Sequence, residues 1–254
     1  MTFRHSKDAV VYWGQYNLSK FLNAASISAS MDAGETTNFA SAGNREYIKG
    51  LKDATLAMEG FYSVATTEPS TEITDVLTSA FAGTTSPVVT VGLEDDTIGR
   101  RAILFLGDIV GFDIDSPVDG VITSSVDLQG SKGYEGGFWL RPLSASTSTG
   151  SNTAVNSGLT NGGTTGGGVG HLHVTSVAST FASATFKVQH STSGSTWADL
   201  ISFTATTAAR VQRSTVSGTV KEQVRATISS YTATAGADTI TAAVAFARYG
   251  PFKG

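Results

Sequence analysis

NAASISASMDAGETTNFASAGNREYIKGLKDATLAMEGF, residues 23–61, is the stretch that decides how the chain is organised. Residues 25–31 and 54–61 alternate small or apolar side chains with polar ones, which is the pattern of half-buried strands. Between these runs lie a polar stretch and the turn-like sequence Gly50-Leu51-Lys52-Asp53. The segment therefore predicts two strands joined by a loop of more than twenty residues. Loops of that length are usually functional, and we expect this one to contact another subunit.

Composition favours a β-rich fold without covalent staples. Of the 254 residues, 40% are hydrophobic and 15% are charged. A chain rich in small residues suits many short strands joined by turns better than long helices. The absence of cysteine excludes disulfides and thiolate-held zinc or iron–sulfur centres. No apolar run approaches the ~20 residues that span a bilayer, and residues 1–8 lead into no signal-type core, so we expect a soluble protein with no membrane partner.

Charge is distributed unevenly along the chain. Residues 1–115 hold 8 Lys and Arg against 15 Asp and Glu, whereas residues 116–254 hold 9 against 6. The net charge of −4 therefore combines −7 in the first part with +3 in the second. Nucleic-acid binding by counterion release needs clustered Lys and Arg, which argues against a DNA-binding surface in the first part. Ordinary surface charge for solubility is the plainer interpretation.

The first half predicts strands and one helix. Apolar or alternating runs predict strands at 9–13, 88–91, 101–106, 109–115 and 120–128. Residues 69–81 predict a helix, because Ser70 or Thr71 can cap it, its apolar residues share one face, and Gly83 stops it. One helix against many strands indicates a mainly β sandwich or barrel domain, which we place at 1–143.

The second half predicts a separate sandwich. Residues 144–170 are rich in Gly, Ser, Thr and Asn and predict a linker or surface loop. Beyond them, turn signals separate six expected strands at 171–177, 184–190, 200–205, 210–216, 221–228 and 239–247. Short strands at this spacing without helices predict a jelly-roll-like β-sandwich domain at 171–254.

Few residues suggest chemistry. His171 and His173 would share one face of a strand and could begin a metal site, but no third ligand is identifiable. The pairs Asp95/Asp96 and Asp113/Asp115 could provide carboxylates for acid–base work or calcium, although Asp in a turn is expected for backbone reasons. No spacing predicts a nucleophile with its base, so we expect no enzyme, no cofactor and no metal.

A series of motifs follows a set order in residues 8–130. They are VVYWG (10–14), the segment 18–22, ETTNF (35–39) after the first long strand, REYIKGLKDATL (45–56) and EGF (59–61). In this order they resemble the major tail (tail tube) proteins of long-tailed, siphovirus-type bacteriophages. The resemblance implies a structural virion protein without catalysis, which self-assembles into stacked rings and forms the conduit for DNA ejection.

The resemblance also implies partners and contact residues. Six copies would close a ring through their inner strands, or three copies if both halves were tube-like. The stacking loop between rings would be 32–45, with Asp32, Glu35, Thr36, Thr37, Phe39 and Arg45 as its contact residues and Phe39 as the anchor. Further implied partners are a tape measure protein, a tail terminator and distal tail proteins. DNA would pass without specific binding, repelled by the acidic first half, in a virion whose subunits are made in the host cytoplasm.

A second resemblance lies in the C-terminal domain. Residues 186–200, FKVQHSTSGSTWADL, resemble the hairpin of discoidin or galactose-binding-like jelly rolls. Trp197 would there be either a core plug or a platform for a sugar ligand. This leaves a rival function, a phage head-decoration or adhesion protein with a carbohydrate-binding sandwich. An enzyme acting on surface polysaccharide is a more distant third.

Overall fold

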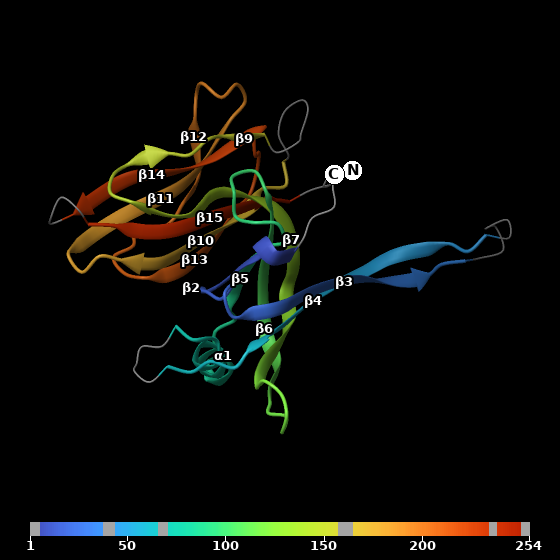
Figure 1. Cartoon of the computed structure of the whole chain (residues 1–254). Helices are drawn as coiled ribbons and strands as arrows, with labels where there is room; N and C mark the ends of the chain where they lie inside the picture. Colours follow the sequence, from blue (N-terminus) through green and yellow to red (C-terminus); the bar gives the residue numbers. More distant parts are fainter. Residues whose placement is uncertain (1–5, 38–43, 66–70, 157–164, 234–237, 250–254) are drawn as a thin grey trace. The chain divides into compact units, whose positions relative to one another are not determined.

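The computed structural model describes residues 6–37, 44–65, 71–156, 165–233 and 238–249, and it is mainly β (Figure 1). This confirms the predicted fold class. Within the described ranges, no helix has the length and apolar character required to cross a membrane.

By internal contacts the chain divides into two compact units that interleave along the sequence. Unit 1 comprises Met1–Lys20, Val88–Phe105 and Glu135–Gly254, and unit 2 comprises Phe21–Pro87 and Leu106–Tyr134. The long strands β6 (Arg101–Asp115) and β7 (Thr123–Ser146) contribute residues to both units. The sequential domains expected at 1–143 and 171–254 stay a prediction.

Unit 1 contains most of the short strands. They are β1 (Val10–Trp13), β2 (Tyr16–Asn17), β5 (Val88–Gly92), β8 (Gly150–Ser151), β9 (Val155–Asn156), β10 (Gly168–Val177), β11 (Phe181–Ser191), β12 (Ala198–Ser202), β13 (Arg210–Val216), β14 (Gln223–Ala233) and β15 (Ile240–Arg248), after a 3-10 turn at Ser6–Asp8. One sheet runs in the order β13-β10-β15-β7-β6-β5-β1-β2, and a second runs β12-β11-β14-β8 with β9 also beside β14. Strands β10 to β15 confirm the six strands predicted in the second half, with ends shifted by a few residues.

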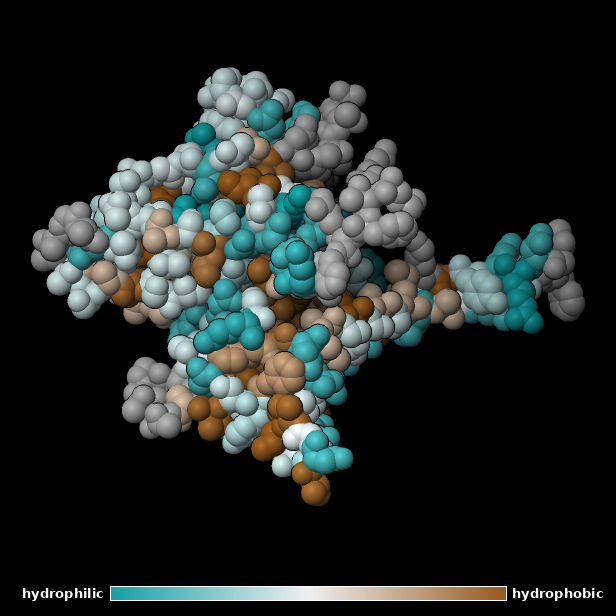
Figure 2. Space-filling view, in the orientation of Figure 1, coloured by the Kyte–Doolittle hydropathy of each residue, from teal (hydrophilic) through white to brown (hydrophobic). Residues whose placement is uncertain are grey.

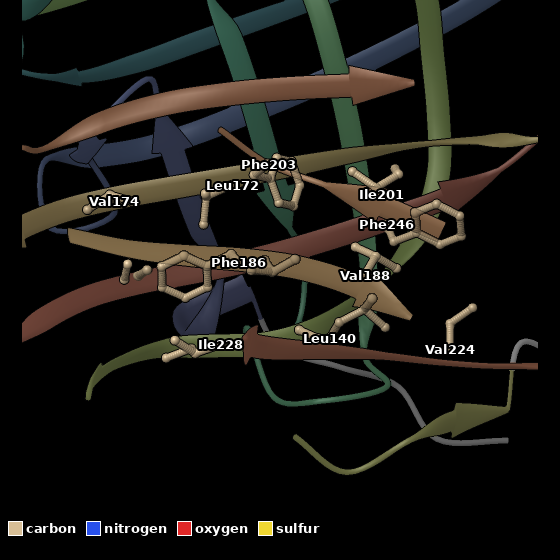
Figure 3. Packing of buried hydrophobic residues seen from close by; sticks show 14 of the residues in the cluster. Leu140, Leu172, Val174, Phe186, Val188, Ile201, Phe203, Val224, Ile228 and Phe246 are labelled. Carbon is tan, nitrogen blue, oxygen red and sulfur yellow. The ribbon is translucent and has the colours of Figure 1, made fainter. Parts of the chain in front are cut away.

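The core of unit 1 lies between these two sheets, as the predicted sandwich requires (Figure 3). Leu172 and Val174 from β10 meet Phe186 and Val188 from β11 and Ile228 from β14. Burying each of these side chains stabilises the fold by about 1.5–3 kcal/mol. Strand β15 is buried on both faces, because its alternate alanines pack into a second cluster on the other side of the sheet.

The linker or loop expected at the Gly/Ser/Thr-rich residues 144–170 stays a prediction as a domain boundary, and the structure has strands within this stretch. Strand β7 runs into it as far as Ser146, β8 and β9 lie within it, and β10 begins at Gly168. The backbone N–H of Asn152 donates to the carbonyl oxygen of Ala226 at 2.9 Å. Small residues can pair with a neighbouring strand as well as form a loop, and the amino-acid composition does not distinguish the two. Residues 157–164 lie outside the described residues.

Unit 2 is built on a sheet in the order β3-β4-β7-β6. Strand β3 (Leu22–Glu35) and strand β4 (Tyr47–Phe61) form a long antiparallel hairpin, with pairs from Leu22↔Gly60 to Glu35↔Tyr47. The predicted loop of more than twenty residues is therefore wrong. Asp32 and Glu35 lie on β3, and the turn-like sequence Gly50-Leu51-Lys52-Asp53 lies within β4. The strand pairing shifts register between Met31 and Ala33, opposite this sequence, which indicates a β-bulge and not a turn.

Helix α1 (Ile73–Ala82) covers one face of this sheet through Ile73, Val76 and Leu77, all of them buried. The helix confirms that residues 69–81 contain one, although it begins at Ile73, and Gly83 is its C-cap as expected. Its N-cap is Glu72, without a side-chain cap, and not the expected Thr71; the other candidate, Ser70, lies outside the described residues. Gly60 on β4 permits the close approach, because a Cβ there would lie 2.6 Å from the carbonyl oxygen of Phe21 and 2.9 Å from Cδ1 of Ile73.

Candidate assembly surface

The two faces of the unit 2 sheet differ sharply in burial. On β4, Ala54, Leu56 and Met58 are buried on the face toward α1. The residues between them, from Asp53 through Glu59, are exposed on the opposite face. Side chains of a strand alternate between faces, so the register carries this division to the neighbouring strands. We call the uncovered side the open face.

The open face is small, polar and acidic. Strand β3 contributes Ala24 and three serines to it, and β7 contributes residues opposite Glu59, Ala57 and Thr55 of β4. Gly111 of β6 belongs to the same face, because a Cβ there would lie 3.3 Å from Oδ2 of Asp127. Its acids are Asp53, Glu59, Asp113, Asp115 and Asp127, all exposed. Among the described open-face positions of these four strands within unit 2 there is no Lys or Arg.

Both edges of this sheet lack a partner within unit 2. Strand β3 pairs with β4 alone in the described structure. Strand β6 pairs with β7, and its other neighbour in the sheet, β5, belongs to unit 1. Unpaired edges present a row of N–H and C=O groups that can pair with another chain. The sheet can therefore be extended at β3 and along the part of the 15-residue β6 that the 5-residue β5 does not reach.

Exposed apolar side chains concentrate in the same unit. Across the residues that the structure describes, every exposed large hydrophobic residue except Leu93 lies in unit 2. They include Leu51 at 80%, Val121 at 65% and Val110 at 63% exposure. Contiguous exposed apolar surface on a soluble chain marks interaction sites. Unit 2, and not the sandwich of unit 1, is thus the surface suited to contacts with other proteins.

The predicted stacking residues lie at the far end of the β3–β4 hairpin. Asp32 and Glu35 are exposed on β3, and Thr36 extends the pairing, since its backbone N–H donates to the carbonyl oxygen of Glu46 at 2.8 Å. The backbone N–H of Glu46 donates to the hydroxyl of Thr37 at 3.0 Å. Arg45 is exposed beside them. Phe39 lies outside the described residues, so its role as an anchor stays a prediction.

The histidine pair forms a buried hydrogen-bonded node in unit 1. His171 and His173 lie on β10 and Thr90 on β5, and each is no more than 1% exposed. Oγ1 of Thr90 lies 2.9 Å from Nδ1 of His171 and 2.7 Å from Nε2 of His173. Nδ1 of His173 lies 2.6 Å from the carbonyl oxygen of Gly14, which only accepts. His173 therefore carries its proton on Nδ1 and accepts from Thr90, and Thr90 accepts from Nδ1 of His171.

This node is suited to holding strands together and unsuited to metal binding. Burial lowers the pKa of His173 to about 4, although its hydrogen bond to Gly14 opposes the shift. Burial also lowers the pKa of His171 well below its usual value, with nearby His173 and Arg213 adding to the effect. Both rings are neutral at pH 7. No group of three or more His, Asp or Glu side chains arranged for a metal ion occurs in the described part of the chain.

The predicted carboxylate pairs are separated by their surroundings. Asp96 accepts hydrogen bonds from the hydroxyl of Tyr12 at 2.6 Å and from the backbone N–H of Leu143 at 2.7 Å. Asp95 accepts from the backbone N–H of Thr97 at 2.8 Å, which is the turn role expected of Asp. Asp113 and Asp115 lie on the open face.

Trp197 is held in a network at the surface of unit 1, and its role as a core plug or a sugar platform stays a prediction. It is half-buried and belongs to neither described core cluster. Its indole Nε1–H donates to the carbonyl oxygen of Gly194 at 3.0 Å, and the guanidinium of Arg225 lies 4.1 Å from the ring centroid. Arg225 in turn donates through Nε and Nη2 to Oε1 of Gln189. The ring is thus held as part of a surface network, with one face covered by a cation.

The sequence contained the signal for the open face without revealing it. The alternation in residues 53–61 and 123–129 places Glu59 and Asp127 on the uncovered side, and it is visible in the sequence. Which side α1 covers decides whether such acids face solvent or a core, and only the fold shows that. The sequence shows Asp113 and Asp115 as a pair, but the surface that they share with Asp53 forms only when β4, β7 and β6 lie side by side.

Comparisons with known proteins give distant likenesses only. No family model matches the sequence, and no curated protein matches it. Two similar chains come from gene transfer agent particles: one from the virion of the native particle and one from the tail of the empty particle, solved with C6 symmetry. Each is 16% identical to this chain, covers 52% of it and 97% of its own length, and gives a TM-score of 0.41. The crystal structure of the SPP1 Dit protein, described as a hub adsorption apparatus in phages that infect Gram-positive bacteria, shares 10% identity, covers 94% of this chain and 98% of its own, and gives 0.37. With such TM-scores, these likenesses carry no argument about what this chain does.

Proposed function

We propose that the protein is a structural virion protein that self-assembles into stacked rings and forms the tail tube of a long-tailed phage, the conduit for DNA ejection. The observation that carries the proposal is the unit 2 sheet, which has an edge at β3 without a described partner, an edge at β6 without a partner inside unit 2, and one uncovered acidic face. A monomer leaves all three features exposed. A closed ring of copies pairs the edges and turns the open face toward a common channel.

The strand directions support a ring. Strand β4 is antiparallel to β3 and to β7, and β6 is joined to β7 by a connection too short for a parallel crossover. The two edge strands of the sheet therefore run in opposite directions. A second copy added by rotation places its β3 antiparallel to β6 of the first, so one pairing rule extends around the ring. Each chain has one such sheet and not two, which supports a ring of six copies in place of three.

The acids of the open face suit a channel that DNA crosses without binding. Asp53, Glu59 and Asp127 would line it, and their charge repels phosphate. The far end of the β3–β4 hairpin, with Asp32, Glu35, Thr36, Thr37 and Arg45, would connect successive rings. A tape measure protein inside the tube, and terminator and distal tail proteins at its ends, are the partners that the family resemblance implies.

Electron microscopy of the purified protein tests this function directly. We expect hollow tubes or stacked rings with a constant diameter, and image averaging would give the number of copies. A protein that stays monomeric by light scattering over a wide concentration range, and that binds glycans on an array, would instead support the adhesion or head-decoration rival. Turnover of polysaccharide, lost on substitution of an Asp or His, would support an enzyme.

A further inference from the structure

Helix α1 extends its apolar stripe to the last strand of the sheet that it covers. Thr74, Leu77 and Phe81 are spaced three and four residues apart and therefore lie on one side of the helix. Oγ1 of Thr74 lies 2.9 Å from Oγ of Ser124 on β7, and the ring centroid of Phe81 lies 6.1 Å from that of Phe112 on β6. Along this stripe the exposure rises from 3% at Thr74 and 1% at Leu77 to 54% at Phe81. The stripe is thus uncovered where unit 2 has no further strand.

The part of β6 beneath this end of α1 is also apolar and uncovered. Side chains alternate along a strand, so Val110 and Ile114 share the side of Phe112, and Gly111 belongs to the open face. Val110 is 63% exposed and Ile114 is 49% exposed. Brown surface is visible around α1 and the adjoining end of the sheet in Figure 2. We call this group the overhang, and its members are Phe81, Val110, Phe112 and Ile114.

The opposite edge of the sheet, β3, has a long run of small uncharged residues. Residues 24–31 pair with β4 in regular register and include no Lys, Arg, Asp, Glu or Pro. Ile27 pairs with Leu56 and Ala29 with Ala54, so both lie on the side of the sheet that α1 covers. Ile27 is nevertheless only half-buried and Ala29 is exposed. Charges and prolines usually protect an edge strand from pairing, and this run has neither, which indicates that it pairs with another strand.

The strand that would cover the overhang has to come from another copy. Within one chain β4 and β7 lie between β3 and β6, which keeps the two edges roughly 14 Å apart at about 4.8 Å per strand. The other described edge strands fit less well: β12 includes Asp199, β13 includes Arg210 and Arg213, and β2, β8 and β9 have two residues each. Among the described edges, β3 therefore offers the long uncharged run that the overhang requires.

Continuation of the sheet brings the matching sides together. A sheet that runs from β6 of one copy to β3 of the next keeps its two sides, so the side facing α1 joins the side facing α1. The small residues of β3 then lie beneath the large residues of the overhang. No charged side chain of residues 24–31 or of the overhang is buried in this contact, which avoids the cost of an unpaired buried charge.

We propose that α1 spans two copies of the chain, covering β4 and β7 of its own sheet and, through the overhang, β3 of the neighbouring copy. The inference rests on the proposed function and adds to it the surface that seals each junction on the side away from the channel. Phe81 packs against Ile27 and Ala29 of the neighbour. Each copy provides one overhang and one β3, so the contact is heterologous and closes when the rotation between copies completes a ring.

Two adjacent residues of β3 give matched variants. Ser28 and Ala29 are both exposed, but Ala29 lies on the side of α1 and Ser28 on the open face. We expect Ala29→Lys to raise the protein concentration needed for rings or tubes roughly tenfold or more, because it buries an unpaired charge in the contact. Ser28→Lys should change it much less. Light scattering measures assembly, and circular dichroism checks that both variants fold. Equal effects of the two substitutions, large or absent, would overturn the inference.

Cross-linking gives a second, independent readout because the chain has no cysteine. Phe81→Cys and Ala29→Cys would be made separately and together, and each protein treated with a short bis-maleimide. A helix that spans two copies predicts covalent oligomers up to the ring number for the double variant, dimers when the two single variants are mixed, and monomers for each single variant alone. Dimers from Ala29→Cys alone would show a two-fold β3–β3 contact and overturn the inference.

The two proposals fail on different results. Tubes that form equally well with Ala29→Lys and Ser28→Lys, without cross-links between positions 81 and 29, would leave the tube function standing and remove the role of α1. Cross-linked oligomers that appear only as open fibres would leave the role of α1 standing and remove the tube. A protein that neither assembles nor cross-links would overturn both proposals.

Discussion

The hydroxyl of Thr90 lies 2.7 Å from Nε2 of His173 and donates to it, while accepting from Nδ1 of His171. The carbonyl oxygen of Gly14 fixes the tautomer of His173, and the hydroxyl of Thr90 then fixes that of His171. We expect Thr90→Val, which keeps the shape and removes the hydroxyl, to lower the free energy of unfolding by about 1–3 kcal/mol, because two buried nitrogens lose their partner. Urea unfolding followed by tryptophan fluorescence measures this, with exposed Thr192→Val as the control. Equal midpoints for both variants would contradict the role of the node.

The same node predicts acid sensitivity. The folded-state pKa of His173 is about 4, below the ~6.5 of an unfolded histidine, so the unfolded chain binds more protons between these values. Stability is then fully present above pH 6.5 and falls as pH falls toward 4. We expect a loss of roughly 2 kcal/mol from His173 between pH 7.5 and 5, with His171 acting in the same direction. Urea midpoints at the two pH values measure the loss, and NMR of the histidine C–H signals should show two rings that do not titrate near 6.5.

Gly60 and Gly150 make a matched pair for testing how α1 packs. A Cβ at Gly60 would lie 2.6 Å from the carbonyl oxygen of Phe21, whereas a Cβ at Gly150 would meet nothing within 4 Å. We expect Gly60→Ala to destabilise unit 2 by about 1–3 kcal/mol through overpacking, and Gly150→Ala to change the unfolding free energy little. Hydrogen exchange of the α1 amides locates the effect. Unchanged α1 protection in Gly60→Ala would show that the sheet and helix adjust freely.

Reversal of charge on the open face should create DNA binding. Glu59 and Asp127 are exposed on neighbouring strands of that face, so the double variant Glu59→Lys and Asp127→Lys turns part of it basic. We expect this variant to retain short DNA at low salt, with affinity falling steeply as salt rises, and the unsubstituted protein to retain none. Fluorescence anisotropy of a labelled oligonucleotide measures both. Charge reversal at Asp199 of unit 1, also exposed, is the control and should have a smaller effect.

Much of the fold follows from the sequence, because its strands alternate in the pattern that burial imposes. The six strands of the second half and the helix ending at Gly83 are confirmed. The errors come from segments where small or polar residues form strands. Asp32 and Glu35 continue β3, since a hairpin can extend as a two-stranded ribbon without an apolar face to signal it. Asn152 and Val155 likewise pack against β14 within a stretch of low complexity.

The candidate surface was less predictable than the fold. The acid excess of the first half is a sequence property, but its gathering on one face depends on the β4–β7 register that places Asp127 opposite Ala57. That register joins residues some seventy positions apart, and no local pattern specifies it. The hydrogen bond between His171 and Thr90 is similarly non-local. The sequence therefore suggested a metal ligand where the fold has a buried hydrogen-bonded node.

The uneven placement of basic residues also makes trypsin a reporter of assembly. Residues 102–131, which form most of the β6–β7 hairpin, contain no Lys or Arg and offer no site to this protease, whereas residues 44–53 at the far end of the β3–β4 hairpin contain Arg45, Lys49 and Lys52. A free subunit should be nicked within residues 44–53 while residues 102–131 stay whole. Subunits joined end to end should resist the same cut, so that the fraction of intact chain on a gel reads out how much of the protein has polymerised.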